Sequence, residues 1–228
     1  MLDDGLKGII AFLQGAENLK NTLRSAHTTT GRQESSAEHS WRLCLLAMLL
    51  GDRFEGVDRE KMLRLCIVHD LAEAVCGDIP APEQAGLSGL DGLSELPGPD
   101  DLPDLPGQSG LAAAMNGRGK EALERQAMQQ LCAALQEPER AGILELWEEY
   151  EAMSTPEARI VKALDKLETL IQHNQGLNPD GFDYNFNLGY GQEHMDCHPL
   201  IRQIRDEVDR CTARNAARTA KPAGKAQS

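Results

Sequence analysis

Apolar side chains recur every three or four residues along most of the chain, which is the period of an amphipathic helix. This spacing predicts a first helix over residues 5–23 and a polar loop over 24–31. Further helices are predicted around the apolar run 41–50 and over 59–75, 121–135, 139–153, about 157–175 and 200–214. Because no parallel sheet or internal repeat is indicated, the expected fold class is all-α, a helical bundle.

Several helix ends carry local signals. Ser35 and Glu38 form a capping box before the run 41–50, and Asp58 is placed to cap the helix that follows. Gly77 is expected to end that helix. The stretch Ser154–Glu157 contains a cap, a proline in the first turn and an acid at the positive end of the helix dipole.

The composition changes between residues 85 and 119, where Gly, Pro, Leu, Ser and Asp dominate and no periodicity survives. A loop of this length in a compact domain is usually functional or disordered. We therefore expect one domain over residues 1–215, with 85–119 as a flexible insertion and 216–228 as a disordered tail.

The chain has 228 residues, 41% of them hydrophobic, and a formal net charge of -13. This acidity argues against nucleic-acid binding, although a small anionic substrate remains possible if a metal and a few arginines set the local field. The six cysteines form no C-x-x-C pair and are expected to be free thiols of a reducing compartment. No apolar stretch of the sequence is long enough to span a membrane, so the expected location is the cytoplasm.

The candidate chemistry is centred on Leu65–Glu73, a mostly apolar helical stretch that contains His69, Asp70 and Glu73. Buried acids and imidazoles are costly unless something cationic compensates them, and a bound metal ion is the simplest compensator. On a helix His69 and Glu73 would share one face. Taken alone, the pair also fits a hydrogen-bonded core histidine with two solvated acids.

Two more candidates lie on other predicted helices. His39 lies in the first turn after the capping box, where a single histidine is more often exposed or capping, and Asp165 lies beside an apolar stripe. With His69 and Asp70 they supply two imidazoles and two carboxylates. This set suits a divalent metal, which could be Mn, Co, Fe, Ni, Zn or Mg, and leaves positions open for water and substrate.

The ordered pattern H…HD…D resembles the HD-domain metal-dependent phosphohydrolases. Four blocks carry a closer resemblance to the YfbR-like and HDDC2-like 5'-deoxynucleotidase branch: residues 32–40, 69–73 with 77–80, 145–151 and 161–166. The similarity covers about residues 6–82 and 118–210.

The resemblance implies a role for each matching residue. His39, His69, Asp70 and Asp165 would bind the metal, and Glu73 would be the catalytic acid or base. Asp78 would contact the deoxyribose and Arg24 the phosphate. The implied reaction is hydrolysis of deoxynucleoside 5'-monophosphates to nucleoside and phosphate.

Three departures from that branch concern the substrate pocket: Ser25 replaces a bulky aromatic residue, the insertion after Glu83 has no counterpart, and the loop 182–190 differs. One alternative is therefore hydrolysis of a nucleoside triphosphate or another phosphate ester on the same core. Another is a catalytically silent metal-binding scaffold. We also expect a homodimer, with no membrane partner.

Overall fold

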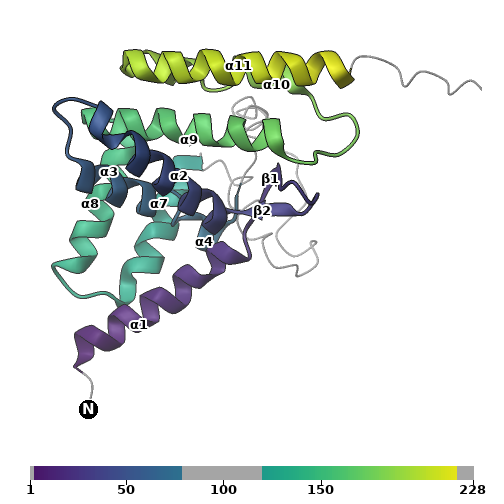
Figure 1. Ribbon diagram of the computed structural model, residues 1–228. Coiled ribbons are helices and arrows are strands. Elements are labelled where there is room, and N and C mark those ends of the chain that lie inside the picture. The colour runs from purple at the N-terminus through teal and green to yellow at the C-terminus, as the bar shows by residue number, and fades with distance from the viewer. Residues whose placement is uncertain (1–2, 79–119, 220–228) are drawn as a thin grey trace, which may run out of the picture. The chain divides into compact units, whose positions relative to one another are not determined.

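The computed structural model describes residues 3–78 and 120–219 (Figure 1), so the predicted insertion 85–119 and residues 220–228 of the predicted tail lie outside them. The elements of the described chain are α1 (Asp4–Ala16), η1 (Glu17–Lys20), β1 (Leu23–His27), β2 (Gln33–Ser35), α2 (Ser36–Leu50), η2 (Gly51–Arg53), α3 (Arg59–Val68), α4 (Glu73–Cys76), α7 (Lys120–Leu131), η4 (Cys132–Ala134), α8 (Glu139–Ala152), α9 (Pro156–Gln175), α10 (Tyr184–Gly189), η5 (Gln192–Cys197) and α11 (Pro199–Thr219). The η elements are short 3₁₀ helices. The predicted all-α class is confirmed.

Residues 17–35 differ from the prediction. The first helix ends at Ala16 and not near residue 23, and the predicted loop contains β1, which pairs with β2 in a two-stranded hairpin. The N–H of Thr28 donates to the carbonyl of Arg32, and Gly31 has φ 83°, which closes the turn. The helical spacing continues to Leu19 only because a 3₁₀ helix follows α1.

The predicted helix 59–75 is interrupted, which corrects the shared-face argument for His69 and Glu73. The α-helix ends at Val68, and a new short helix begins at Glu73. Between them the backbone N–H groups of Leu71 and Glu73 bond three residues back, to Val68 and Asp70. This tighter winding carries His69 and Asp70 out of the helical register.

The predicted caps are confirmed. The N–H of Ser35 donates to Oε2 of Glu38 over 2.9 Å, and the N–H of Glu38 donates to Oγ of Ser35 over 3.3 Å. Oδ1 of Asp58 accepts from the N–H of Lys61, and Oγ1 of Thr155 accepts from the N–H of Ala158. Gly77 ends α4 with φ 79°.

Contacts divide the described chain into two compact units, each built from separate stretches. Unit 1 takes in residues 3–25, 35–38, 67–78 and 120–148, and unit 2 takes in residues 26–34, 39–66 and 149–219. In unit 1, α1, α4 and α7 pack around a hydrophobic core that includes Leu71, Met128 and Trp147. The expectation of one domain over 1–215 stays a prediction.

In unit 2, α9 packs along α11, and α10 and η5 contact α11 as well (Figure 1). The core of this unit includes Leu43, Leu164 and Ile201, all fully buried. α11 continues to Thr219, five residues beyond its predicted end. This extension makes residues 216–219 of the expected tail helical.

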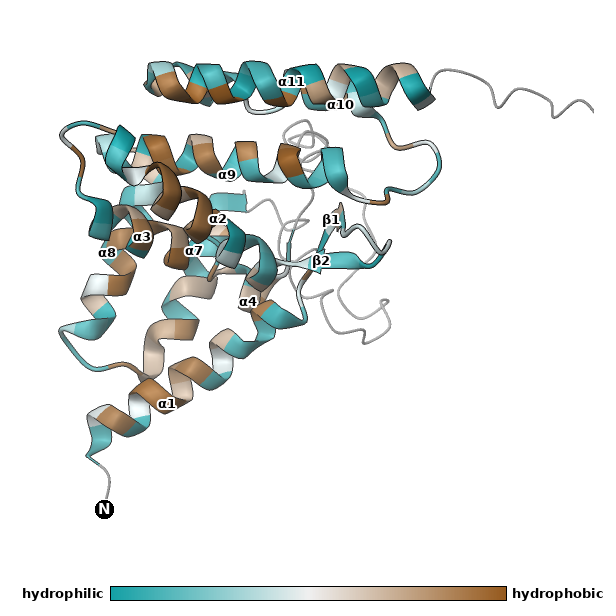
Figure 2. Cartoon of the chain, in the orientation of Figure 1, coloured by the Kyte–Doolittle hydropathy of each residue, from teal (hydrophilic) through white to brown (hydrophobic). Residues whose placement is uncertain are grey.

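α2 has exposed as well as buried apolar side chains, and its C-terminal part is brown in Figure 2. Trp41, Met48 and Leu49 are 64%, 58% and 71% exposed, whereas Leu43 and Ala47 are buried. None of the helices among the described residues has the length and apolarity that a membrane span requires.

Candidate functional site

In unit 1 the structure brings the consecutive residues His69 and Asp70 together. Nε2 of His69 lies 3.2 Å from Oδ2 of Asp70, with the imidazole buried and the carboxylate side chain 16% exposed. Neighbouring residues on an α-helix point about 100° apart and do not face each other. The end of α3 at Val68 is therefore what allows the imidazole and the carboxylate to approach one point.

Arg24 reaches the same carboxylate. It lies on β1, and its Nη1 is 3.3 Å from Oδ2 of Asp70. The hairpin, which the sequence pattern did not predict, thus places a guanidinium beside the His69–Asp70 pair. A guanidinium is always charged and presents five N–H donors in a planar fork, a geometry that matches carboxylate and phosphate oxygens.

Glu73 is the first residue of α4 and is buried in unit 1. Its Oε2 accepts a hydrogen bond from Oγ of Ser36 over 2.6 Å, and its backbone carbonyl accepts from Oγ1 of Thr22. Burial raises the pKa of Glu73 well above its usual value, and the negative charges of Asp70 and Asp78 raise it further. Arg24 and Ser36 act in the opposite direction. The carboxyl therefore keeps its proton to a higher pH than an ordinary glutamate does, as a general acid or base requires.

In unit 2 the structure brings His39 and Asp165 together. His39 is fully buried, contrary to the expectation for a histidine in a first helical turn, and its Nε2 lies 3.2 Å from Oδ1 of Asp165. The second oxygen of Asp165 accepts from the hydroxyl of Tyr150 over 2.9 Å and lies 3.0 Å from Nζ of Lys166. One carboxylate oxygen is thus held by its neighbours, while the other faces the imidazole.

Glu168 is a site residue that the sequence analysis missed. It is 1% exposed, it contacts Nδ1 of His39 through Oε2, and its Oε1 lies 2.6 Å from Nε of Arg42. Its position three residues after Asp165 puts it on the same side of α9, and this spacing was the available sequence signal. Ser36 and Tyr150 were also missed, although both lie inside or beside motif blocks.

The predicted site residues therefore form two groups. Unit 1 holds Arg24, His69, Asp70, Glu73 and Asp78, and unit 2 holds His39 and Asp165. Each group contains an imidazole with a carboxylate oxygen within 3.2 Å. Buried imidazole nitrogen and carboxylate oxygen are suitable ligands for a first-row divalent metal, so the residues present fit such an ion.

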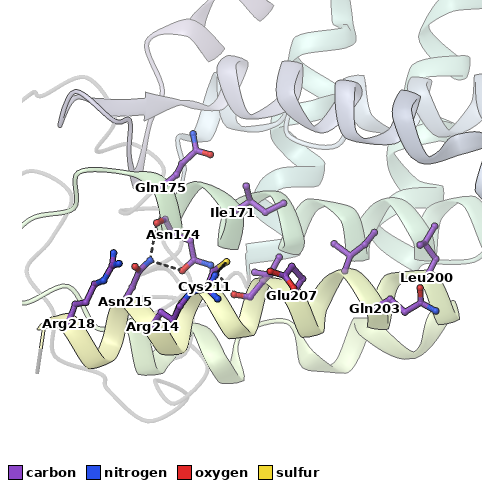
Figure 3. Close-up of a pocket in the computed structure, with 12 residues that line it drawn as sticks. Ile171, Asn174, Gln175, Leu200, Gln203, Glu207, Cys211, Arg214, Asn215 and Arg218 are labelled. Carbon is purple, nitrogen blue, oxygen red and sulfur yellow. Dashed lines mark hydrogen bonds between the residues drawn. The ribbon is translucent and has the colours of Figure 1, made fainter.

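An open groove in unit 2 lies away from these groups. It runs between α9 and α11 and is lined by Ile171, Asn174 and Ile204 among others (Figure 3). Asn174 bonds across it to Thr212, and Asn215 donates to the carbonyl of Asn174. Nine residues separate Asp165 from Asn174, which places them on opposite faces of α9. The groove is therefore no part of the Asp165 site.

Comparison with known proteins agrees with this chemistry. The family model of the HD domain matches residues 16–205. The chain is 29% identical to the 5'-deoxynucleotidase HDDC2 of Homo sapiens, over 95% of this chain and 92% of that protein. It is 31% identical to the 5'-deoxynucleotidase hdd1 of Schizosaccharomyces pombe, over 72% of this chain and 70% of that protein.

Among solved structures, a predicted metal-dependent phosphohydrolase from Magnetospirillum magnetotacticum superimposes with a TM-score of 0.66 at 25% identity. The match covers 94% of this chain and 98% of that one. The resemblance inferred from the motif blocks is thereby confirmed. The chain belongs to the HD-domain family, in the 5'-deoxynucleotidase group.

Proposed function

We propose that the chain is a metal-dependent phosphohydrolase that converts deoxynucleoside 5'-monophosphates to nucleoside and phosphate. The observation that carries this proposal is the buried Glu73, whose carboxyl is held by Ser36 in the unit that contains His69 and Asp70. The names of the curated relatives support the substrate class.

The metal would be held by His39, His69, Asp70 and Asp165. This donor set suits Mn, Co, Fe, Ni or Zn better than Mg, which prefers oxygen ligands and water. When bound, a divalent ion lowers the pKa of a coordinated water and neutralises phosphate charge. Elemental analysis of the purified protein would identify the ion.

Three residues of unit 1 would act on the substrate. Glu73 would take the proton of the attacking water or give one to the leaving oxygen, which its raised pKa permits. Arg24, whose guanidinium lies beside Asp70, would bind the non-bridging phosphate oxygens in the planar geometry that suits phosphate. Asp78, whose charge already acts on Glu73, would contact the deoxyribose.

The test is phosphate release from a panel of deoxy- and ribonucleoside mono- and triphosphates with Mn, Co, Mg or Zn added. We expect turnover of deoxynucleoside monophosphates by the wild type and none by Glu73→Gln with metal still bound. Glu60→Gln, an exposed glutamate on α3, is the matched control and should retain full activity.

Each other outcome points to a different function. Release of triphosphate would favour the nucleoside triphosphate alternative. A folded, metal-loaded wild type that is inert on all nucleotides and on other phosphate esters would overturn the proposal in favour of a silent scaffold.

We further propose that the chain is a homodimer that buries the open face of α2. Trp41, Met48 and Leu49 share this face, and a helix that is apolar all round is normally buried on all sides. Light scattering should give a dimer for the wild type, a monomer for Met48→Glu and a dimer for Leu177→Glu, an equally exposed control. A monomeric wild type at micromolar concentration would contradict this.

For location we propose the cytoplasm. Cys44, Cys66, Cys76, Cys132, Cys197 and Cys211 are free thiols, as expected in a reducing compartment. Fractionation of cells that express the full chain tests the proposal.

A further inference from the structure

One face of α9 carries three buried polar side chains at a spacing of three and four residues. They are Asp165, Glu168 and Gln172, each less than 6% exposed. Burying a carboxylate costs several kcal/mol unless it is paired and hydrogen bonded. The role of the Glu168 carboxylate can therefore be inferred from the groups that pair with it.

Glu168 is held between an imidazole and a guanidinium. Its Oε2 contacts Nδ1 of His39, and its Oε1 lies 2.6 Å from Nε of Arg42. The guanidinium also donates to Oε1 of Gln172, whose Nε2 donates to the backbone carbonyl of His27 over 2.6 Å. The chain of contacts thus runs from the imidazole to a fixed backbone atom, entirely within unit 2.

This arrangement favours hydrogen on one particular ring nitrogen of His39. A carboxylate accepts hydrogen bonds, so the nitrogen that it contacts, Nδ1, carries the hydrogen. A neutral imidazole has one remaining lone pair, here on Nε2, which faces Oδ1 of Asp165 at 3.2 Å. Nε2 is the nitrogen that a metal held jointly with Asp165 would require.

The same residues could be read as a cation site of their own. Ligand atoms of Glu34, His39 and Glu168 all lie within 4.8 Å of one another. A cation there would need the lone pair of Nδ1, which is lost when that nitrogen carries a hydrogen. The guanidinium of Arg42 already balances the charge of Glu168. The contacts therefore favour a positioning role over a second ion.

We propose that Glu168, held by Arg42 and Gln172, is a positioning residue that keeps His39 protonated at Nδ1 and so presents Nε2 to the metal. The inference rests on the proposed assignment of His39 as a ligand. It adds to that assignment a residue and a protonation state. Outer carboxylates of this kind typically change metal affinity by about 10- to 100-fold.

The first measurement is the tautomer of His39 in the metal-free protein, read from the nitrogen chemical shifts of its ring with His39→Gln to assign the signals. The wild type should show hydrogen on Nδ1, and Glu168→Ala should show hydrogen on Nε2 or a mixture. A wild type with hydrogen on Nε2 would overturn the proposal, whatever the enzyme's activity.

The second measurement is the dissociation constant and stoichiometry for Mn and Zn. Glu168→Ala should bind about 100-fold more weakly and Glu168→Gln about 10-fold more weakly. Glu207→Gln, an exposed acid of α11, controls for loss of one negative charge and should not change affinity. If Glu168→Ala does not fold, Gln172→Ala replaces it and should weaken binding less.

Unchanged affinity in a folded Glu168→Ala would contradict the positioning role. Two ions per chain in the wild type, falling to one in Glu168→Ala, would show the separate cation site. If the proposed function fails instead, phosphate release is absent while the tautomer and affinity results still stand, so the two failures are distinguishable.

Discussion

Ser36 donates its hydroxyl hydrogen to Oε2 of Glu73 over 2.6 Å, across 37 residues of sequence, in a buried part of unit 1. This contact ties the first residue of α2 to the first residue of α4. The hydrogen bond stabilises the ionised carboxylate, whereas burial and the charges of Asp70 and Asp78 oppose ionisation. The charge of Arg24 also favours ionisation, so the pKa of Glu73 is set by the difference between these opposing effects.

We predict that Ser36→Ala shifts the pH profile of kcat upward. Without the hydroxyl the pKa of Glu73 rises further, because the hydrogen bond from Ser36 favours the ionised carboxylate. If Glu73 acts as a base, the acidic limb moves to higher pH, and if it acts as an acid, the basic limb does. Rates measured from pH 5 to 9 identify the limb. Both limbs staying in place in a folded variant would contradict the assignment of Glu73.

We predict that Tyr150→Phe weakens metal binding. The variant removes the hydroxyl that donates to Oδ2 of Asp165, and leaves Lys166 as the other neighbour of that oxygen. We expect about 10-fold weaker binding of Mn and a loss of about 1 kcal/mol in the free energy of unfolding. Tyr184→Phe is the matched control, because its hydroxyl accepts from Asn178 elsewhere in unit 2. Equal effects of both variants would argue against a role at Asp165.

We predict opposite effects of alanine at two helical glycines. A Cβ at Gly8 would lie 2.2 Å from the backbone oxygen of Ala134, whereas a Cβ at Gly142 would meet nothing within 4 Å. Gly8→Ala should therefore lower the free energy of unfolding by about 1–3 kcal/mol. Gly142→Ala should raise it by up to about 1 kcal/mol, because alanine is the better helix former. Urea unfolding of both variants measures this, and a neutral Gly8→Ala would contradict the packing of α1 on η4.

We predict that protonation of Glu157 at acidic pH lowers the free energy of unfolding. Burial raises the pKa of this carboxyl, but hydrogen bonds from the N–H of Asp58 and from Lys61 outweigh burial and lower the pKa to about 2. A lowered pKa gives stability that is present above the unfolded value, about 4.3, and is lost as the pH falls toward 2. Unfolding measured at pH 6 and pH 3 should show a smaller loss in Glu157→Gln than in the wild type. An equal loss would mean that other carboxylates account for the acid sensitivity.

The sequence predicted those features that depend on neighbouring residues. The capping box at Ser35 and Glu38 and the stop at Gly77 are local hydrogen-bond and backbone preferences, and both are present. The apolar stripe of α9 similarly predicted its length. The candidate ligands followed from four ordered motif blocks, and the resemblance that these blocks carry is confirmed. The role of each residue as a ligand stays a prediction.

The features that the sequence did not predict depend on contacts between distant parts of the chain. The apolar period continues through residue 75, so periodicity alone could not reveal that α3 ends at Val68. The partner of His39 lies 129 residues away at Glu168, and the spacing of Glu168 from Asp165 does not identify it as that partner. The hairpin at 23–35 is largely polar and has few of the alternating apolar residues that indicate a strand.

The capping box has a consequence for the motion of the site. Ser36 and His39 both lie in the first turn of α2, and Glu38 of the box holds the N–H of Ser35 at its start. Fraying of this one turn would release Ser36 from Glu73 and His39 from Glu168 in the same event. The rate of amide hydrogen exchange in residues 35–39 would thus report how often these two contacts are lost together.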